Sequence, residues 1–273
     1  MHLHTLDTGL FKLDGGAMFG VVPKSIWHKL NPADDNNMCT WAMRCLLLEH
    51  GDRLILVDTG IGDKQDAKFF SHYYLHGEGS LESSIQKAGF SLAEVTDVLL
   101  THLHFDHVGG AVRRQADGSL RPTFTNARYW SNRRHWAWAV QPNARERASF
   151  LAENILPLQE SGQLHFVEDA DNQPFGPEIE LITVDGHTEQ MMLPLFTAGG
   201  TRYLFGADLV PSAAHVPLPY VMGYDMRPLQ TLEEKARILG RCADEGITLL
   251  LEHDHQRPTC AIERTERGLK AVL

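Results

Sequence analysis

The apolar positions of the chain fall into short runs that end at glycine, aspartate or asparagine. A loose alternation of apolar and polar positions over residues 2–14 predicts an edge strand, on which His2 and His4 share one face. We do not expect these two histidines to be metal ligands. Apolar runs at residues 43–48 and 53–57 flank a glycine-containing turn and therefore predict a β-hairpin.

Helical patterns separate the strand-like runs. Residues 80–88 and 144–155 are expected to be helical, and Pro157 is expected to end the second helix. A capping-box pattern that starts at Thr231 predicts a further helix, which Gly246 should stop.

More strands are predicted in the second half of the chain, and residues 168–177 are expected to form a loop. The expected strands lie at residues 178–184, 191–196 and 247–251, with a further pair around Gly199-Gly200. No linker rich in proline or serine divides the chain. We therefore expect an α/β fold in which two packed β-sheets carry helices on their outer faces, formed by one domain over residues 1–273.

The stretch THLHFDHVGG, at residues 101–110, carries the clearest chemical signal. It follows an apolar run at residues 95–101 that predicts a buried strand, and Gly109-Gly110 permits a tight turn where a helix begins. A lone His-x-His usually belongs to a surface loop, but the full His-x-His-x-Asp-His run after a strand is far more specific. Imidazole and carboxylate together suit zinc, iron or manganese. The four donors are His102, His104, Asp106 and His107.

Other strand ends carry further donors, namely His187, Asp208 and His253. Three imidazoles can hold one ion, and Asp208 can bridge to a second. In this assignment the first ion binds His102, His104 and His187, and the second binds Asp106, His107 and His253. Asp58 follows another apolar run, and it either orients a metal-binding histidine or caps a turn.

Composition limits the partners. The chain has 273 residues, of which 43% are hydrophobic, enough for one substantial core. A formal net charge of −10 argues against nucleic acid as a partner. No apolar run approaches the roughly 20 residues that span a bilayer, and the N-terminus lacks a signal pattern. The 4 cysteines are scattered, which suggests free thiols in a reducing compartment, so we expect a cytoplasmic protein.

The arrangement resembles the metallo-β-lactamase superfamily. The matching motifs run in family order over nearly the whole chain: DTG at 58–60, THLHFDH at 101–107, DGH at 185–187, GAD at 206–208 and EHD at 252–254. The resemblance implies an αββα sandwich with a dinuclear centre. Zinc is the usual metal, with iron, manganese and cobalt as alternatives.

Within this superfamily the chain resembles the quorum-quenching N-acyl-homoserine lactonase branch at residues 14–24 and 213–225. That likeness implies a hydrolase in which a bridging hydroxide opens a lactone or related ester, while Asp106 returns a proton to the leaving group. The known lactonases place a catalytic tyrosine where this chain has Pro211. The candidate substitutes in this sequence are His215, Tyr220 and Tyr224, and the alternative is that the activity differs from that of the lactonases.

The predicted substrate is a small molecule with an apolar portion. The apolar segment at residues 15–30 either caps a pocket or packs in the core. The residues expected to contact substrate are Met18, Phe19, Trp27, Phe105, Tyr220 and Tyr224. A homodimer is one assembly to be considered.

Other functions remain open at this point. A phosphotriesterase, a thioesterase or a β-lactamase would use the same metal chemistry. An iron-dependent oxygenase is a further alternative, although di-iron relatives have glutamate where this chain has His104. A binding protein that keeps the metals without catalysis is the remaining hypothesis.

Overall fold

The computed structural model describes residues 1–169 and 175–273, so the predicted loop at 168–177 lies partly outside the described residues. The chain divides into two compact units. The first unit comprises Met1–Gly9, Met43–Ser71 and Gly77–Glu178, and the second comprises Leu10–Ala42, His72–His76 and Ile179–Leu273. The mixed α/β class with two sheets, predicted above, is confirmed. The single-domain organisation stays a prediction.

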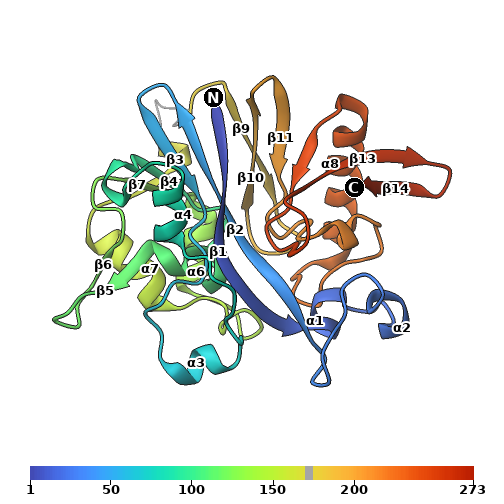
Figure 1. Ribbon diagram of the computed structural model, residues 1–273, viewed down its shortest axis with the longest axis horizontal. Helices are drawn as coiled ribbons and strands as arrows, with labels where there is room; N and C mark the ends of the chain where they lie inside the picture. Colours follow the sequence, from blue (N-terminus) through green and yellow to red (C-terminus); the bar gives the residue numbers. More distant parts are fainter. Residues whose placement is uncertain (170–174) are drawn as a thin grey trace. The chain divides into compact units, whose positions relative to one another are not determined.

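One six-stranded sheet supplies most strands of the first unit, and its two N-terminal strands also contribute residues to the second unit. Its strands in spatial order are β1 (His2–Asp14), β2 (Met38–His50), β3 (Arg53–Val57), β4 (Asp97–Leu99), β7 (Arg128–Ser131) and β8 (Leu164–Phe166) (Figure 1). The hairpin of β2 and β3 is antiparallel, as predicted, whereas β3, β4, β7 and β8 pair in parallel.

Helices and a small ribbon complete the first unit. The helices are α3 (Ala67–Ser71), α4 (Leu81–Lys87), α5 (Phe105–Val108), α6 (Arg133–Val140) and α7 (Ala152–Glu160), and the ribbon joins β5 (Val112–Arg114) to β6 (Leu120–Pro122). Apolar side chains from the sheet and from α4, α6 and α7 form one buried cluster. This core fixes the strand ends from which the candidate ligands project.

The second unit is built on the other six-stranded sheet. Its order is β14 (Gly268–Val272), β13 (Thr259–Thr265), β12 (Thr248–Leu250), β11 (Thr201–Phe205), β10 (Met191–Ala198) and β9 (Ile179–Val184). The parallel pair of β11 and β12 is joined through helix α8 (Pro228–Glu245), while the remaining pairs are antiparallel. Two short helices, α1 (Gly15–Phe19) and α2 (Lys24–Trp27), stand where the sequence suggested an apolar loop.

The predicted boundaries of the helices at α7 and α8 are wrong. Helix α7 begins at Ala152, whereas the predicted helix began at residue 144. Helix α7 runs through Pro157, because its flanking residues Ile155 and Leu158 are buried and this burial outweighs the poor helix propensity of proline. Helix α8 begins with Pro228, a residue suited to the first helical position, so Thr231 lies inside the first turn instead of capping it.

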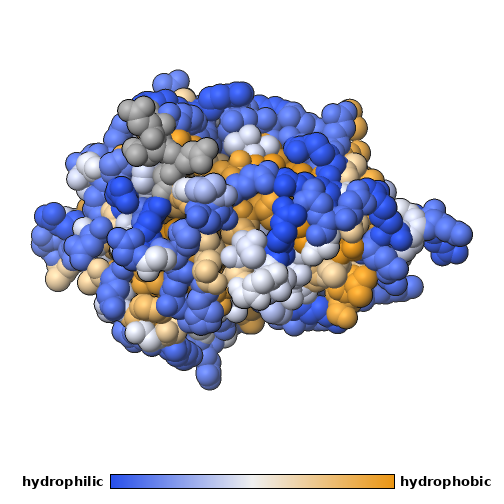
Figure 2. Space-filling view, turned by 90° about the horizontal axis from the view of Figure 1, so that it is seen from above, coloured by the Kyte–Doolittle hydropathy of each residue, from blue (hydrophilic) through white to orange (hydrophobic). Residues whose placement is uncertain are grey.

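Among residues 1–169 and 175–273, no helix combines the length and the apolar character needed to cross a bilayer. Figure 2 shows one face of the molecule on which hydrophilic residues predominate, with hydrophobic areas between them.

Candidate functional site

The His-x-His-x-Asp-His motif leaves β4 and forms helix α5 in the first unit. The helix begins at Phe105, earlier than the predicted start after Gly109-Gly110, with His104 as its N-cap residue. All four donors are buried. His102 Nε2 lies 3.1 Å from His104 Nδ1, and His107 Nε2 lies 3.8 Å from a carboxylate oxygen of Asp106. The motif therefore presents two close pairs of donor atoms.

The glycine pair that follows the motif permits a close backbone approach, whereas the sequence suggested a turn. A Cβ atom on Gly109 would collide with the carbonyl oxygen of Ile61, and one on Gly110 would collide with that of Thr59. Any larger residue would push these backbones apart. The two glycines therefore let the motif lie directly against the segment that follows β3.

Asp58, at the end of β3, holds the motif in place. One carboxylate oxygen accepts a hydrogen bond from the backbone N–H of Thr101 at 2.8 Å, and the other accepts one from the Thr101 hydroxyl at 2.6 Å. The second oxygen also lies 3.2 Å from His107 Nδ1. A proton on that nitrogen leaves His107 Nε2 as the nitrogen that can donate to a metal.

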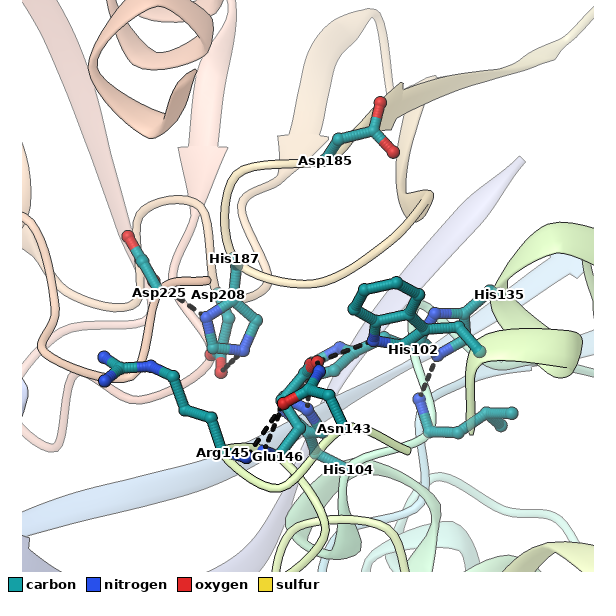
Figure 3. A network of polar contacts seen from close by, with 12 residues as sticks. His102, His104, His135, Asn143, Arg145, Glu146, Asp185, His187, Asp208 and Asp225 are labelled. Carbon is teal, nitrogen blue, oxygen red and sulfur yellow. Dashed lines mark hydrogen bonds and ion pairs between the residues drawn. The ribbon is translucent and has the colours of Figure 1, made fainter. Parts of the chain in front are cut away.

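Glu146 orients the ring of His104 in the same way, and no feature of the sequence predicted this contact. Its carboxylate accepts hydrogen bonds from Trp138 Nε1 at 2.6 Å and Asn143 Nδ2 at 2.8 Å, and it lies 3.3 Å from His104 Nε2 (Figure 3). His104 Nδ1 is then the nitrogen that faces His102. The only signal was a helical pattern in this part of the chain, and helical patterns do not reveal contacts between distant residues.

The backbone of the motif has its own support from His135, on α6. The Nε2 atom of His135 accepts a hydrogen bond from the N–H of Leu103 at 2.8 Å, and the N–H of His135 donates to Asn132, which caps the helix. Leu103 lies between the first two histidines of the motif. The ring of His135 therefore holds the loop through its backbone, and this hydrogen bond occupies no ring nitrogen of His102 or His104.

In the second unit, one carboxylate faces two imidazoles. Asp208 follows β11, and its Oδ2 atom lies 3.0 Å from His187 Nε2, while its Oδ1 atom lies 3.0 Å from His253 Nε2. The three side chains are buried. Each oxygen of Asp208 thus has its own imidazole, an arrangement in which the carboxylate can lie between two cations.

The other ring nitrogens of these imidazoles are also engaged. His187 Nδ1 lies 2.8 Å from an Asp225 oxygen, and His253 Nδ1 lies 2.7 Å from the carbonyl oxygen of Ala42. Burial opposes the charged form of His187, but the carboxylates of Asp208 and Asp225 raise its pKa to about 10. The negative charge of these two carboxylates, which favours a proton on this ring, also favours a metal cation beside it.

The residues predicted to contact substrate separate into buried and accessible ones. Met18, Phe19 and Trp27 are fully buried, and the ring of Phe19 stacks on that of Trp27 with centroids 5.4 Å apart. For these three residues the structure favours the core-packing alternative. Tyr220 is half-buried and Tyr224 is exposed, so both can meet a ligand. Phe105, in the first unit, is buried beside the ring of Phe69.

His215 lies in a position that does not suit the predicted role of proton donor to substrate. Its Nδ1 atom lies 2.7 Å from the Ser212 hydroxyl, and its Nε2 atom lies 2.9 Å from the carbonyl oxygen of Met18. The ring also stacks on Phe19, with centroids 4.5 Å apart. Burial lowers the pKa of His215 to about 3. Both ring nitrogens serve internal hydrogen bonds, so the geometry favours a role in holding α1 against the loop after Asp208.

The chain matches one family model, that of the metallo-beta-lactamase superfamily, over residues 44–241. It is similar to an N-acyl homoserine lactonase of Bacillus thuringiensis, with 24% identity over 252 residues that cover 87% of this chain and 90% of the relative. Probable metallo-hydrolases of Mycobacterium bovis and Mycobacterium tuberculosis are 34% identical over 110 residues. That match spans only about a third of their length, 35%.

Solved structures share the fold. A probable metal-dependent hydrolase from Staphylococcus aureus superposes with a TM-score of 0.88 at 25% identity, covering 99% of this chain and 96% of that one. A dizinc quorum-quenching lactonase, solved with the product of its reaction, superposes with a TM-score of 0.80 at 21% identity, covering 99% and 93%. At that identity the second likeness concerns the fold alone.

Proposed function

Because the chain belongs to the metallo-beta-lactamase superfamily, we propose that it is a hydrolase that uses two divalent metal ions to open a lactone or a related ester. Zinc is the metal that we expect, because buried imidazole and carboxylate donors suit it. The observation that carries this proposal is Asp208, whose two oxygens face His187 and His253 separately.

The donor spacing within each unit fits metal binding. Two ligands of a tetrahedral zinc ion, each about 2.0–2.1 Å from it, lie about 3.3 Å apart. His102 Nε2 and His104 Nδ1 are separated by 3.1 Å, and each oxygen of Asp208 is 3.0 Å from its imidazole. Small shifts of side chains would therefore open these contacts to the separation that an ion requires.

We propose one set of ligands for each of the two ions. We assign three imidazoles to one ion and a mixed set to the other, with Asp208 shared between the two. The first set is His102, His104 and His187, and the second set is Asp106, His107 and His253. This assignment also agrees with the residues that the family resemblance implies.

The proposed mechanism uses residues that would bind the two metal ions and residues that would transfer protons. When bound, the two ions would lower the pKa of a water molecule and stabilise negative charge on the carbonyl oxygen of the substrate. Asp58 and Asp225 keep the protons of His107 and His187 on Nδ1, which reserves Nε2 for binding. A carboxylate oxygen of Asp106 would take the proton that the attacking water releases and pass it to the leaving alkoxide, and the hydroxyl of Tyr220 would donate a hydrogen bond to the carbonyl oxygen.

The lactone assignment rests on the similarity to a lactonase over 87% of this chain and on accessible aromatic residues. We propose that Tyr220 and Tyr224 contact an apolar portion of the substrate, with Phe105 beside the metal-binding residues. Because they are buried, Met18, Phe19 and Trp27 would not contact the substrate and would instead pack in the core of the second unit.

A hydrolysis screen tests this function. The metal-loaded protein is assayed against N-acyl-homoserine lactones of several chain lengths, aryl esters, phosphotriesters and thioesters, before and after removal of metal with a chelator. We expect the lactones to give the highest kcat/KM and chelation to abolish it. A clear preference for phosphotriesters or thioesters would replace the lactone assignment, and full activity without metal would overturn the metal-dependent mechanism.

A variant tests the shared carboxylate. Asp208→Asn should bind fewer ions per chain, measured by elemental analysis, and lose most hydrolysis. Asp244→Asn is the matched control, because Asp244 is an exposed carboxylate paired with Arg264. Full metal content in Asp208→Asn would contradict the bridging assignment.

A further inference from the structure

A second group of metal donors lies in the first unit, away from the motif residues in the chain. His2 and His4 stand on β1, and Glu49 stands on the neighbouring strand β2. His2 Nδ1 lies 2.8 Å from Glu49 Oε1, and His4 Nε2 lies 2.6 Å from the same oxygen. The donor atoms of these three residues are close enough together to hold one ion.

The geometry points to a third, exchangeable metal site at this edge of the sheet, made by His2, His4 and Glu49 and separate from the proposed catalytic pair. We propose that it takes a late first-row divalent cation, namely copper, zinc or nickel, because imidazole suits these metals. The sequence did not favour these histidines as ligands, because a lone His-x-His is a weak signal. The added observation is that a carboxylate 45 residues away faces both rings.

The donors are arranged before any ion arrives. Alternate positions on a strand place His2 and His4 on one face, and their ring centroids lie 4.4 Å apart. The His4 ring also packs against the Phe90 ring in a T-shaped arrangement, with centroids 5.9 Å apart, which restricts its rotation. To bind zinc at a tetrahedral donor separation of about 3.3 Å, the contacts of 2.6 and 2.8 Å need to open by only about 0.5–0.7 Å.

The site is open to solvent, which distinguishes it from the buried candidate ligands of the motif. The side chains of His2, His4 and Glu49 are 70%, 22% and 40% exposed. An ion can therefore enter and leave without opening the core, and water can complete its coordination. Such an ion would link β1 to β2, because its ligands lie on both strands. It would therefore hold the edge strand β1 on the sheet.

Copper is the best probe, because divalent copper binds nitrogen and oxygen sites most tightly of this series. The protein loaded with two zinc ions per chain, enough for the proposed catalytic pair alone, is titrated with copper(II) in the presence of a competing chelator, and the bound copper is examined by electron paramagnetic resonance. We expect one copper per chain with coupling to two imidazole nitrogens. Zinc content and hydrolysis should stay unchanged, which separates this site from the catalytic one.

Variants decide whether these residues form the site. His4→Ala should weaken copper binding at least tenfold and remove one nitrogen coupling, and Glu49→Gln should weaken it less. His50→Ala is the matched control, because His50 lies on the same strand outside the donor group and is 28% exposed. The proposal is overturned if the double variant His2→Ala/His4→Ala binds copper as tightly as the parent, if His50→Ala weakens binding equally, or if copper binds only by displacing zinc.

Discussion

The carboxylate of Glu146 sets which nitrogen of His104 carries a proton, and this makes it a sensitive point of the proposed metal centre. Its Oε2 atom accepts from two donors, Trp138 Nε1 and Asn143 Nδ2, while its Oε1 atom faces His104 Nε2. A carboxylate can accept all of these protons, but an amide cannot. Glu146→Gln therefore changes the chemistry while it keeps the shape.

The outcome follows from counting donors. If the new NH2 group took the Oε2 position, it would face two N–H donors, so it should take the Oε1 position and face His104. His104 Nε2 must then accept a hydrogen bond, and the ring proton moves to Nδ1. That nitrogen, 3.1 Å from His102 Nε2, is the one assigned to the metal. The variant therefore holds His104 in the wrong tautomer.

We expect the variant to bind metal roughly 10–100-fold more weakly, which corresponds to about 1.4–2.7 kcal/mol. Two effects act in opposite directions. The 3.3 Å distance between His104 and Glu146 is longer than the ~2.7–2.9 Å of a strong charged hydrogen bond, so loss of the charge alone should cost little. The forced change of tautomer adds to that cost, and we therefore expect a value near the middle of the range.

The assay is competition for zinc against a fluorescent chelator, with nitrogen NMR of the histidine rings to identify the tautomer of His104. Glu153→Gln is the matched control, because Glu153 is partly buried and accepts from Gln65 without touching a candidate ligand. A folded Glu146→Gln protein with parental zinc affinity, or with the proton of His104 still on Nε2, would refute this reasoning.

Three further variants give separable outcomes. Asp58→Asn should lower metal affinity roughly 10–100-fold without abolishing binding, and a crystal structure with Asp58 bound directly to metal would contradict its orienting role. Burial lowers the pKa of Lys235 to about 7, against the opposing charge of a nearby carboxylate, so between about pH 7 and 10.5 the unfolded chain binds a proton that the folded chain does not. The stability of the parent should therefore rise with pH in this window, by up to about 1.4 kcal/mol per unit relative to Lys235→Met; parallel denaturation profiles would contradict this. His215→Phe should cost about 1–3 kcal/mol of folding stability in denaturant titrations, because the partners Ser212 and Met18 lose their hydrogen bonds, while kcat changes little. A loss of 10²–10³-fold in kcat at unchanged stability would instead support a catalytic His215 (about the effect of removing an oxyanion donor).

The sequence predicted the strand ends because the physical signal there is local. An apolar, β-branched run followed abruptly by polar residues marks the point where a strand leaves the core. The run at 95–101 shows the limit of this signal, since only Asp97–Leu99 pair as β4 although the next residues are also buried. Hydrophobicity reports burial, whereas strand length depends on where a neighbouring strand ends.

The apolar segment at residues 15–30 could not be resolved from sequence for a related reason. A pocket wall and a core layer require the same side chains, and only their neighbours distinguish them. Phe19 stacks on Trp27, which is near it in the sequence, and also on His215, which is almost two hundred positions away. No periodicity carries that information.

The partners of the candidate ligands were the least predictable feature, and they matter for how the two ions should differ. Glu146 and Asp225 lie 42 and 38 residues from the histidines that they contact. Any buried acceptor can fill this position, as His253 shows by using the neutral carbonyl of Ala42. A carboxylate partner makes an imidazole a more basic donor than a carbonyl partner does. In the proposed assignment, the first ion has two carboxylate-backed rings, His104 and His187. The second ion has one, that of His107 beside Asp58, and it gains further charge directly from Asp106. The two ions would then differ in which part of the chain controls their affinity, and only the hydrogen-bonding partners, not the ligand motif itself, reveal that difference.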